Sequence, residues 1–188
     1  MLRDLIKTCR SYRRFSQEKR IDEHTMIGLV DLARLTASGQ NKQPLKFIII
    51  KKNNENNQVF SCLKWAGALK DWEGPAVNER PTGYIIIVGD KTIKQSFGID
   101  HGIAAQSIML GAAEAGFGGC MIGSILKTEL NNILKLNKNY EILLVLALGS
   151  PAETVVIEEI KDNNTDYWRD EKSIHHVPKR SLEEIIIK

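Results

Sequence analysis

Three short apolar runs constrain the fold of this chain most strongly. They cover residues 47–50, 84–88 and 142–148, and none is long enough to cross a lipid bilayer. The middle run, YIIIV, is rich in β-branched residues and is followed by Gly89 and Asp90, a pattern typical of a fully buried strand. We therefore predict three strands in the core of the protein.

Residues around these runs show the spacing of amphipathic helices. One helix is expected over residues 2–11, and a second begins after Asp22, whose side chain is a good helix N-cap. The longest is predicted over residues 100–117, where many glycines and alanines let other backbones approach closely, so we expect it to be covered on most sides. A later helix is expected to be capped by Thr128. Because helices and strands interleave, the pattern indicates an α/β or α+β fold.

The C-terminal part of the chain differs from the rest. The chain has 188 residues, the length of one domain, and we expect a single domain over residues 1–188. Beyond a short strand expected at 155–157, the periodicity fades, and we predict an extended or irregular C-terminal arm over residues 161–188. Such an arm is either exchanged with or packed on a partner subunit, or it lies across its own domain.

Several classes of function lack the residues that they need. The three cysteines form no C-x-x-C pair and the four histidines show no metal-ligand spacing, so we expect neither a disulfide framework nor a metal site. No G-x-S-x-G, G-x-x-x-x-G-K-[ST] or G-x-G-x-x-G motif is present. The N-terminus lacks the apolar segment of a signal peptide. We therefore expect a cytoplasmic protein without a membrane partner.

Positive charge is concentrated at the N-terminus. The first 20 residues contain seven Lys or Arg and two acidic residues, whereas the whole chain has a formal net charge of +3. Arg10, Ser11 and Arg13 could place several donors around one anion, because a guanidinium group matches a phosphate. On charge alone, a solvated basic face is the simpler interpretation. A nucleic-acid surface would need more basic and aromatic residues, so we expect no nucleic-acid partner.

A polar loop, SGQNKQP at residues 38–44, precedes the first apolar run. Ser38, Asn41 and Gln43 offer both donors and acceptors, as the edge of a planar heteroaromatic ligand requires. The same side chains could instead cap the backbone of their own turn. These residues alone do not choose between the two interpretations.

The order of four motifs resembles the nitroreductase family. The motifs are RSYRRF at residues 10–15, SGQNKQP at 38–44, DHGIAAQ at 100–106 and KRSLEE at 179–184. The resemblance implies an α+β fold with a central mixed sheet flanked by helices and an extended C-terminal arm. It also implies an intertwined homodimer with one FMN at each of two subunit interfaces.

The same resemblance implies an FMN-dependent oxidoreductase that follows a ping-pong mechanism. Hydride passes from NADH or NADPH through FMN to a small-molecule acceptor such as a nitroaromatic or a quinone, with the chemistry at FMN N5 and no catalytic side chain assigned. The implied cofactor-binding residues are Arg10, Ser11, Arg13, Lys179 and Arg180 for the phosphate, Ser38, Gly39, Asn41 and Gln43 in a loop from the partner subunit, and Ile122 and Gly123 beside N5.

The chain departs from the usual family pattern at several positions. Cys9 stands where many members have arginine, Ala37 where the usual residue is proline, and Leu45 where it is tryptophan. Two other functions are kept as alternatives. One is a flavin-binding or flavin-processing protein of the same superfamily without reductase activity, and the more remote one is a basic nucleic-acid-binding module.

Overall fold

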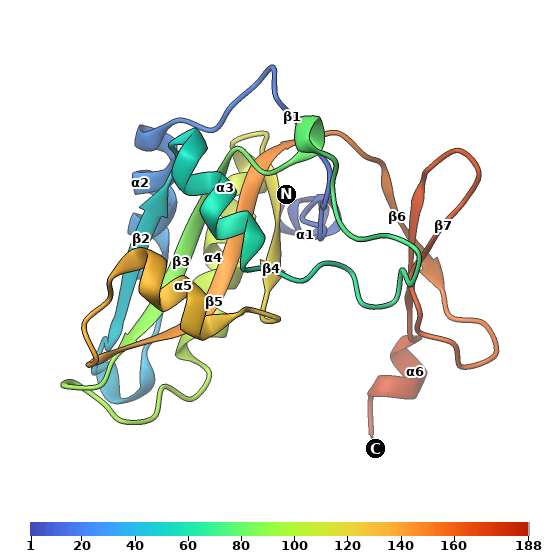
Figure 1. Ribbon diagram of the computed structural model, residues 1–188. Coiled ribbons are helices and arrows are strands. Elements are labelled where there is room, and N and C mark those ends of the chain that lie inside the picture. Colours follow the sequence, from blue (N-terminus) through green and yellow to red (C-terminus); the bar gives the residue numbers. More distant parts are fainter. Residues whose placement is uncertain (188) are drawn as a thin grey trace.

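A five-stranded sheet forms the centre of the computed structural model, which describes residues 1–187 (Figure 1). Its strands are β1 (Phe15–Ser16), β2 (Leu45–Ile50), β3 (Gly83–Asp90), β4 (Gly118–Ile122) and β5 (Tyr140–Pro151). β3 lies between β2 and β5, and β4 and β1 pair with β5 as well. All four ladders are antiparallel, and Ile86, for example, pairs with Ile48 on one side and Val145 on the other.

The apolar runs form the buried strands of this sheet. Every residue of β3 is buried, because helices cover both faces. Side chains alternate between the faces, so Ile85 and Ile87 belong to one core cluster whereas Tyr84, Ile86 and Val88 belong to the other. The three strands predicted from the apolar runs are thereby confirmed as β2, β3 and β5.

Helices pack on both faces of the sheet. The helices of residues 1–187 are α1 (Leu2–Thr8), α2 (Glu23–Arg34), α3 (Asn53–Ser61), α4 (Asp100–Glu114), α5 (Lys127–Leu134) and α6 (Leu182–Ile185), with short 3₁₀ turns at Gly39–Asn41 and Val77–Glu79. Met26 of α2 and Ile108 of α4 lie in the core on one face, and Val59 of α3 and Leu130 of α5 lie in the core on the other. The α+β fold class is confirmed, whereas the main sheet, which was expected to be mixed, has antiparallel ladders throughout within residues 1–187.

The small residues of α4 allow α2 to pack closely against it. A methyl group on Gly111 would lie 2.3 Å from the Leu32 Cδ1 atom of α2. Ala104, Ala105 and Ala112 are also buried, so the prediction of a covered central helix is confirmed.

Two predicted helix starts have different outcomes. Asp22 caps α2 as predicted, since its carboxylate accepts a hydrogen bond from the Thr25 amide at 2.8 Å. The prediction for Thr128 is wrong, because α5 begins at Lys127 after Leu126 and has no side-chain cap.

The C-terminal segment forms a second, smaller sheet. Its strands are β6 (Val155–Glu159), β7 (Trp168–Arg169) and β8 (His175–Lys179), with β8 in the middle. The ladder between β6 and β8 is parallel, and the ladder between β7 and β8 is antiparallel. Figure 1 shows this sheet and α6 set to one side of the main sheet. The arm predicted as extended or irregular is therefore more ordered than the sequence indicated.

Within residues 1–187, no helix is both long enough and apolar enough to cross a lipid bilayer.

Candidate functional site

A cavity of about 340 Å³ lies between the N-terminal segment and strand β8. It brings together Arg10, Ser11, Arg13 and Lys179, four of the residues for which the family resemblance implied contact with the phosphate. Its other lining residues come from the N-terminal segment, α4, β4 and the arm, and are Cys9, Gln106, Met109, Met121, Tyr167, His175 and Val177. We call this space the anion pocket.

Strand β4 holds the N-terminal segment beside the anion pocket. Ser11 forms a bridge with Gly119, and the Tyr12 amide donates to the Gly119 carbonyl at 2.8 Å. A methyl group on Gly119 would lie 2.3 Å from the carbonyl oxygen of Ala147, so glycine is needed for β4 to approach β5 this closely. The position of Ser11 therefore depends on the packing of β4 against β5.

The alternation of β8 explains which C-terminal cation enters the anion pocket. His175, Val177 and Lys179 line it, as expected for residues two apart on one strand. Arg180 follows the strand and lies outside the pocket, where its Nη1 atom is 3.0 Å from the Glu184 carboxylate. The structure therefore brings Lys179, but not Arg180, together with the N-terminal residues.

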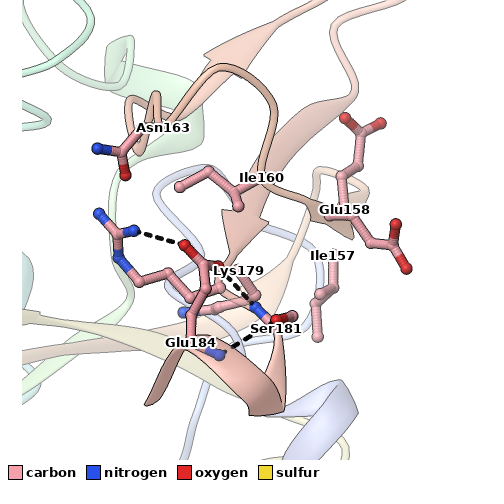
Figure 2. A pocket seen from close by; sticks show the side chains of 9 residues that line it. Ile157, Glu158, Ile160, Asn163, Lys179, Ser181 and Glu184 are labelled. Carbon is pink, nitrogen blue, oxygen red and sulfur yellow. Dashed lines mark hydrogen bonds and ion pairs between the residues drawn. The ribbon is translucent and has the colours of Figure 1, made fainter.

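Arg180 lines a neighbouring cavity of about 620 Å³ beside α6. Figure 2 shows Ser181 and Glu184 at this cavity, where each accepts a hydrogen bond from the other's backbone amide. Glu158 also lines the cavity, so carboxylates lie beside its two cations, Lys179 and Arg180. This lining is not suited to holding a second anion.

The anion pocket has an unbalanced positive charge. Its lining includes Arg10, Arg13 and Lys179 but neither aspartate nor glutamate. Within residues 1–187, none of these three side chains forms an ion pair. Arg10 donates to the Ile6 carbonyl at 2.7 Å, and its buried Nε atom has no hydrogen-bond partner in the described part of the chain. Such a set of donors favours an oxyanion with several acceptor oxygens.

Arg13 is the most constrained of these cations. It is 9% exposed, and its guanidinium carbon lies 4.6 Å from the centre of the Tyr167 ring. Its Nη1 atom lies 3.3 Å from the Ser11 carbonyl oxygen and 3.2 Å from Nε2 of His175. Its backbone amide donates to Glu153. Arg13 is therefore fixed at both its backbone and its side chain.

A second cavity, of about 180 Å³, adjoins the anion pocket. Arg13, Met121 and Tyr167 line both spaces. Ile122 and Gly123, which the resemblance placed beside the flavin N5, line the second one. A methyl group on Gly123 would meet no atom within 4 Å, so the backbone there borders open space. The two cavities together offer room for an anionic group joined to a flat group.

The polar loop at residues 38–44 lies elsewhere in the same chain. Ser38 and Gln43 line a different cavity, of about 420 Å³, next to the start of α4. None of Ser38, Gly39, Asn41 or Gln43 lines the anion pocket or the cavity that adjoins it. Within one chain, the loop is therefore not brought together with the cationic residues.

Asp100, at the start of α4, anchors this loop. The Ser38 hydroxyl donates to the Asp100 carboxylate at 2.7 Å, and the Gly39 amide donates to it at 3.0 Å. The Ser38 oxygen in turn accepts from the Gln43 amide at 3.0 Å. The sequence motif contained Asp100, but its role was missed because the contact joins residues 62 positions apart.

The anchored loop has an uncommon backbone. Gln40, Asn41 and Gln43 have φ values of 55°, 55° and 50°, in the left-handed region that non-glycine residues seldom adopt. Conformations of this kind persist where surrounding contacts hold them, and they are concentrated at functional sites. The hydrogen bonds to Asp100 are contacts of this type, so the loop is preorganised.

We predict that Asp100→Asn destabilises the protein by about 1–3 kcal/mol at neutral pH. The two hydrogen bonds reach different carboxylate oxygens, and the NH2 group of asparagine would face one of the two donors. Burial alone would raise the pKa of Asp100, but the bonds from Ser38 and Gly39 and the charge of Lys94 outweigh it and hold this pKa below its usual value. The carboxylate therefore contributes stability above its unfolded-state pKa of about 4, and that contribution is lost as the pH falls through the lower folded-state value.

Urea unfolding of both proteins at neutral and at acidic pH measures this difference. The gap in unfolding free energy is expected to shrink in acid. An equal gap at both pH values would show that the ionised carboxylate does not anchor the loop.

Comparison with known proteins gives a consistent result. Residues 6–150 match the sequence model of the Nitroreductase family. The fold is similar to a nitroreductase family protein from Streptococcus pneumoniae TIGR4, with 14% identity, a TM-score of 0.71 and 100% of both chains covered. It is also similar to an FMN-dependent nitroreductase from Clostridium difficile R20291, with 21% identity, a TM-score of 0.65 and coverage of 85% of this chain and 90% of that one.

A third solved structure, from Exiguobacterium sibiricum 255-15, is a complex with FMN. It is 17% identical, has a TM-score of 0.68, and the match covers 81% of this chain and 89% of that chain. At such identities, similarity to solved structures shows the fold alone, whereas the match to the family model extends over most of the sequence. The chain belongs to the nitroreductase family.

Proposed function

We propose that this chain is an FMN-dependent oxidoreductase that takes hydride from NADH or NADPH and reduces an acceptor such as a nitroaromatic or a quinone. The observation that carries the proposal is the anion pocket, where Arg10, Arg13 and Lys179 line a space without a carboxylate. Family membership supports an oxidoreductase. Bound FMN would supply the hydride-transfer chemistry, and the protein would supply binding and orientation.

The residues present fit FMN. The buried Nε of Arg10 has no partner among residues 1–187, as expected of a donor that awaits a ligand oxygen. We propose that Arg10, Ser11, Arg13 and Lys179 hold the phosphate. The adjoining cavity would receive the flavin ring, with the backbone of Ile122 and Gly123 beside it. Arg180 is left out of the proposed phosphate site because it pairs with Glu184.

We propose further that the functional unit is a homodimer. The preorganised loop with Ser38, Gly39, Asn41 and Gln43 lies away from the anion pocket of its own chain, so these residues would contact the FMN of a partner subunit. The C-terminal arm has exposed apolar side chains at Leu182, Ile185 and Ile186, which a partner subunit could cover. A single domain would then contribute to two sites.

Steady-state kinetics of the FMN-loaded protein test the proposed reaction. Initial rates are measured with NADH and with NADPH at several concentrations of a quinone or a nitroaromatic. Double-reciprocal plots are expected to give parallel lines, because the nucleotide product leaves before the acceptor binds. Tight flavin binding without turnover by any of these pairs would instead favour a flavin-binding or flavin-processing protein of the same superfamily.

A further inference from the structure

His175 occupies an unusual position beside Arg13. It is 1% exposed, lies on β8 and lines the anion pocket. Its Nε2 atom is 3.2 Å from Nη1 of Arg13. A guanidinium group can only donate hydrogen bonds, so this contact requires Nε2 to accept and the proton of the imidazole to sit on Nδ1. The geometry therefore selects a neutral imidazole.

The surroundings of His175 keep the ring neutral. Burial, followed by the positive charge of Arg13, lowers the pKa of His175 to about 4. Glu153 opposes this change, but Arg169 adds to it. Glu153 is already engaged with Arg169 at 2.9 Å and with the backbone amide of Arg13. At neutral pH the side chain of Arg13 therefore has a neutral acceptor beside it.

The arrangement of His175 carries a cost to the fold. Its Nδ1 atom is buried and has no hydrogen-bond partner in the described residues. A donor that is buried without a partner destabilises a fold, because it has given up its hydrogen bonds to water. The nearby Tyr167 ring, with its centroid 5.2 Å from that of His175, offers packing but no acceptor in this contact. Stability alone does not account for a histidine at this place.

A neutral acceptor has one advantage over a carboxylate at this position. Aspartate or glutamate would orient Arg13 equally well, but it would form an ion pair and reduce the positive charge available to a ligand. The imidazole orients the guanidinium and leaves its full charge for the anion. The other residues that line the anion pocket include no carboxylate either, so its lining leaves the charges of Arg10 and Lys179 available to an anion as well.

We propose that His175 is a positioning residue, which orients the guanidinium of Arg13 toward the FMN phosphate while leaving the charge of Arg13 uncompensated. The proposal rests on the proposed function, because it takes the anion to be the phosphate of FMN. It predicts that His175 affects recognition of the phosphate and has little effect on binding of the ring.

Three variants of the full-length protein test the proposal. His175→Phe keeps an aromatic ring without an acceptor, His175→Gln offers a neutral carbonyl acceptor, and His175→Glu offers a charged one. Dissociation constants for FMN and for riboflavin, which lacks the phosphate, are measured on protein stripped of flavin. The ratio of the two constants reports the contribution of the phosphate alone.

In the phenylalanine variant, the preference for FMN over riboflavin is expected to fall about tenfold, while the affinity for riboflavin stays unchanged. A tenfold change corresponds to about 1.4 kcal/mol, the size of one charge-assisted hydrogen bond. The glutamine variant should recover most of that preference. The glutamate variant should lose it as well, because it neutralises Arg13.

The outcomes separate this proposal from the proposed function. If the wild type prefers FMN and the phenylalanine variant keeps the same preference, the role of His175 is overturned and the phosphate site stands. A glutamate variant with wild-type preference would also overturn it. If the wild type shows no preference for FMN over riboflavin, the phosphate site itself is overturned, and the role of His175 falls with it.

Discussion

Replacing Arg13 with alanine is expected to weaken FMN binding by about ten- to one-hundred-fold. The guanidinium of Arg13 is almost fully buried at the border of the anion pocket and the adjoining cavity. Hydrogen bonds to charged groups contribute about 1.5–3 kcal/mol, and each 1.4 kcal/mol is about tenfold in affinity. Titration of flavin-free protein with FMN, followed by quenching of flavin fluorescence, measures the change.

Arg14→Ala is the matched control for this experiment. Arg14 is the neighbouring residue of the same type, but it lines another cavity and lies 3.5 Å from the carboxylate of Glu79. Its removal should change FMN affinity by no more than about threefold, since substitutions away from a site usually alter free energies by about 0.5 kcal/mol. Equal losses in the two variants would mean that the effect is one of general charge.

Replacing Glu153 with alanine is expected to destabilise the protein by about 3–5 kcal/mol, the usual cost of breaking a buried ion pair. The Glu153 side chain is 1% exposed and pairs with Arg169, which is 12% exposed, at 2.9 Å. Glu153 also accepts from the backbone amides of Arg13 and of Arg14. Its loss would leave a buried cation and two amides without partners, and it would release the segment that carries Arg13.

Urea unfolding at neutral pH measures this effect, with Glu159→Ala as the control. Glu159 is an exposed carboxylate at the end of β6, and its removal should change the unfolding free energy by less than about 0.5 kcal/mol. A loss below about 1 kcal/mol for Glu153→Ala, within the range of an exposed ion pair, would contradict the role assigned to the network. FMN affinity should fall with stability, because the network joins Arg169 of β7 to the N-terminal segment that carries Arg13.

Three strands of the main sheet, β2, β3 and β5, could be predicted because they are apolar on both faces. A run such as YIIIV at residues 84–88 has few alternatives to burial, and the structure places it at the centre. Strand β8 could not be predicted in this way. Its residues are His175-His176-Val177-Pro178-Lys179, which show no apolar alternation. Its partner β6 was indicated by the short strand expected at 155–157, but nothing in the sequence indicated that the two would pair. The different positions of Lys179 and Arg180 follow from this strand.

The candidate site was partly predictable for a similar reason. Arg10, Ser11 and Arg13 are close in the sequence, and although charge alone favoured a solvated basic face, the family resemblance implied that they share a phosphate. The contacts that fix Arg13 could not, because Glu153 and His175 lie 140 and 162 positions away. Neither residue belongs to a motif. Folding brings His175 to Arg13 on β8 and Glu153 to it on the connection between β5 and β6.

Anaerobic addition of NADH or NADPH to the FMN-loaded protein tests the central claim most directly. We expect at least one of the two nucleotides to bleach the yellow flavin absorbance, and a quinone or nitroaromatic added afterwards without oxygen to restore it. Flavin that stays oxidised in the presence of both nucleotides, or protein that binds no FMN, would contradict the assignment of this chain as an FMN-dependent oxidoreductase.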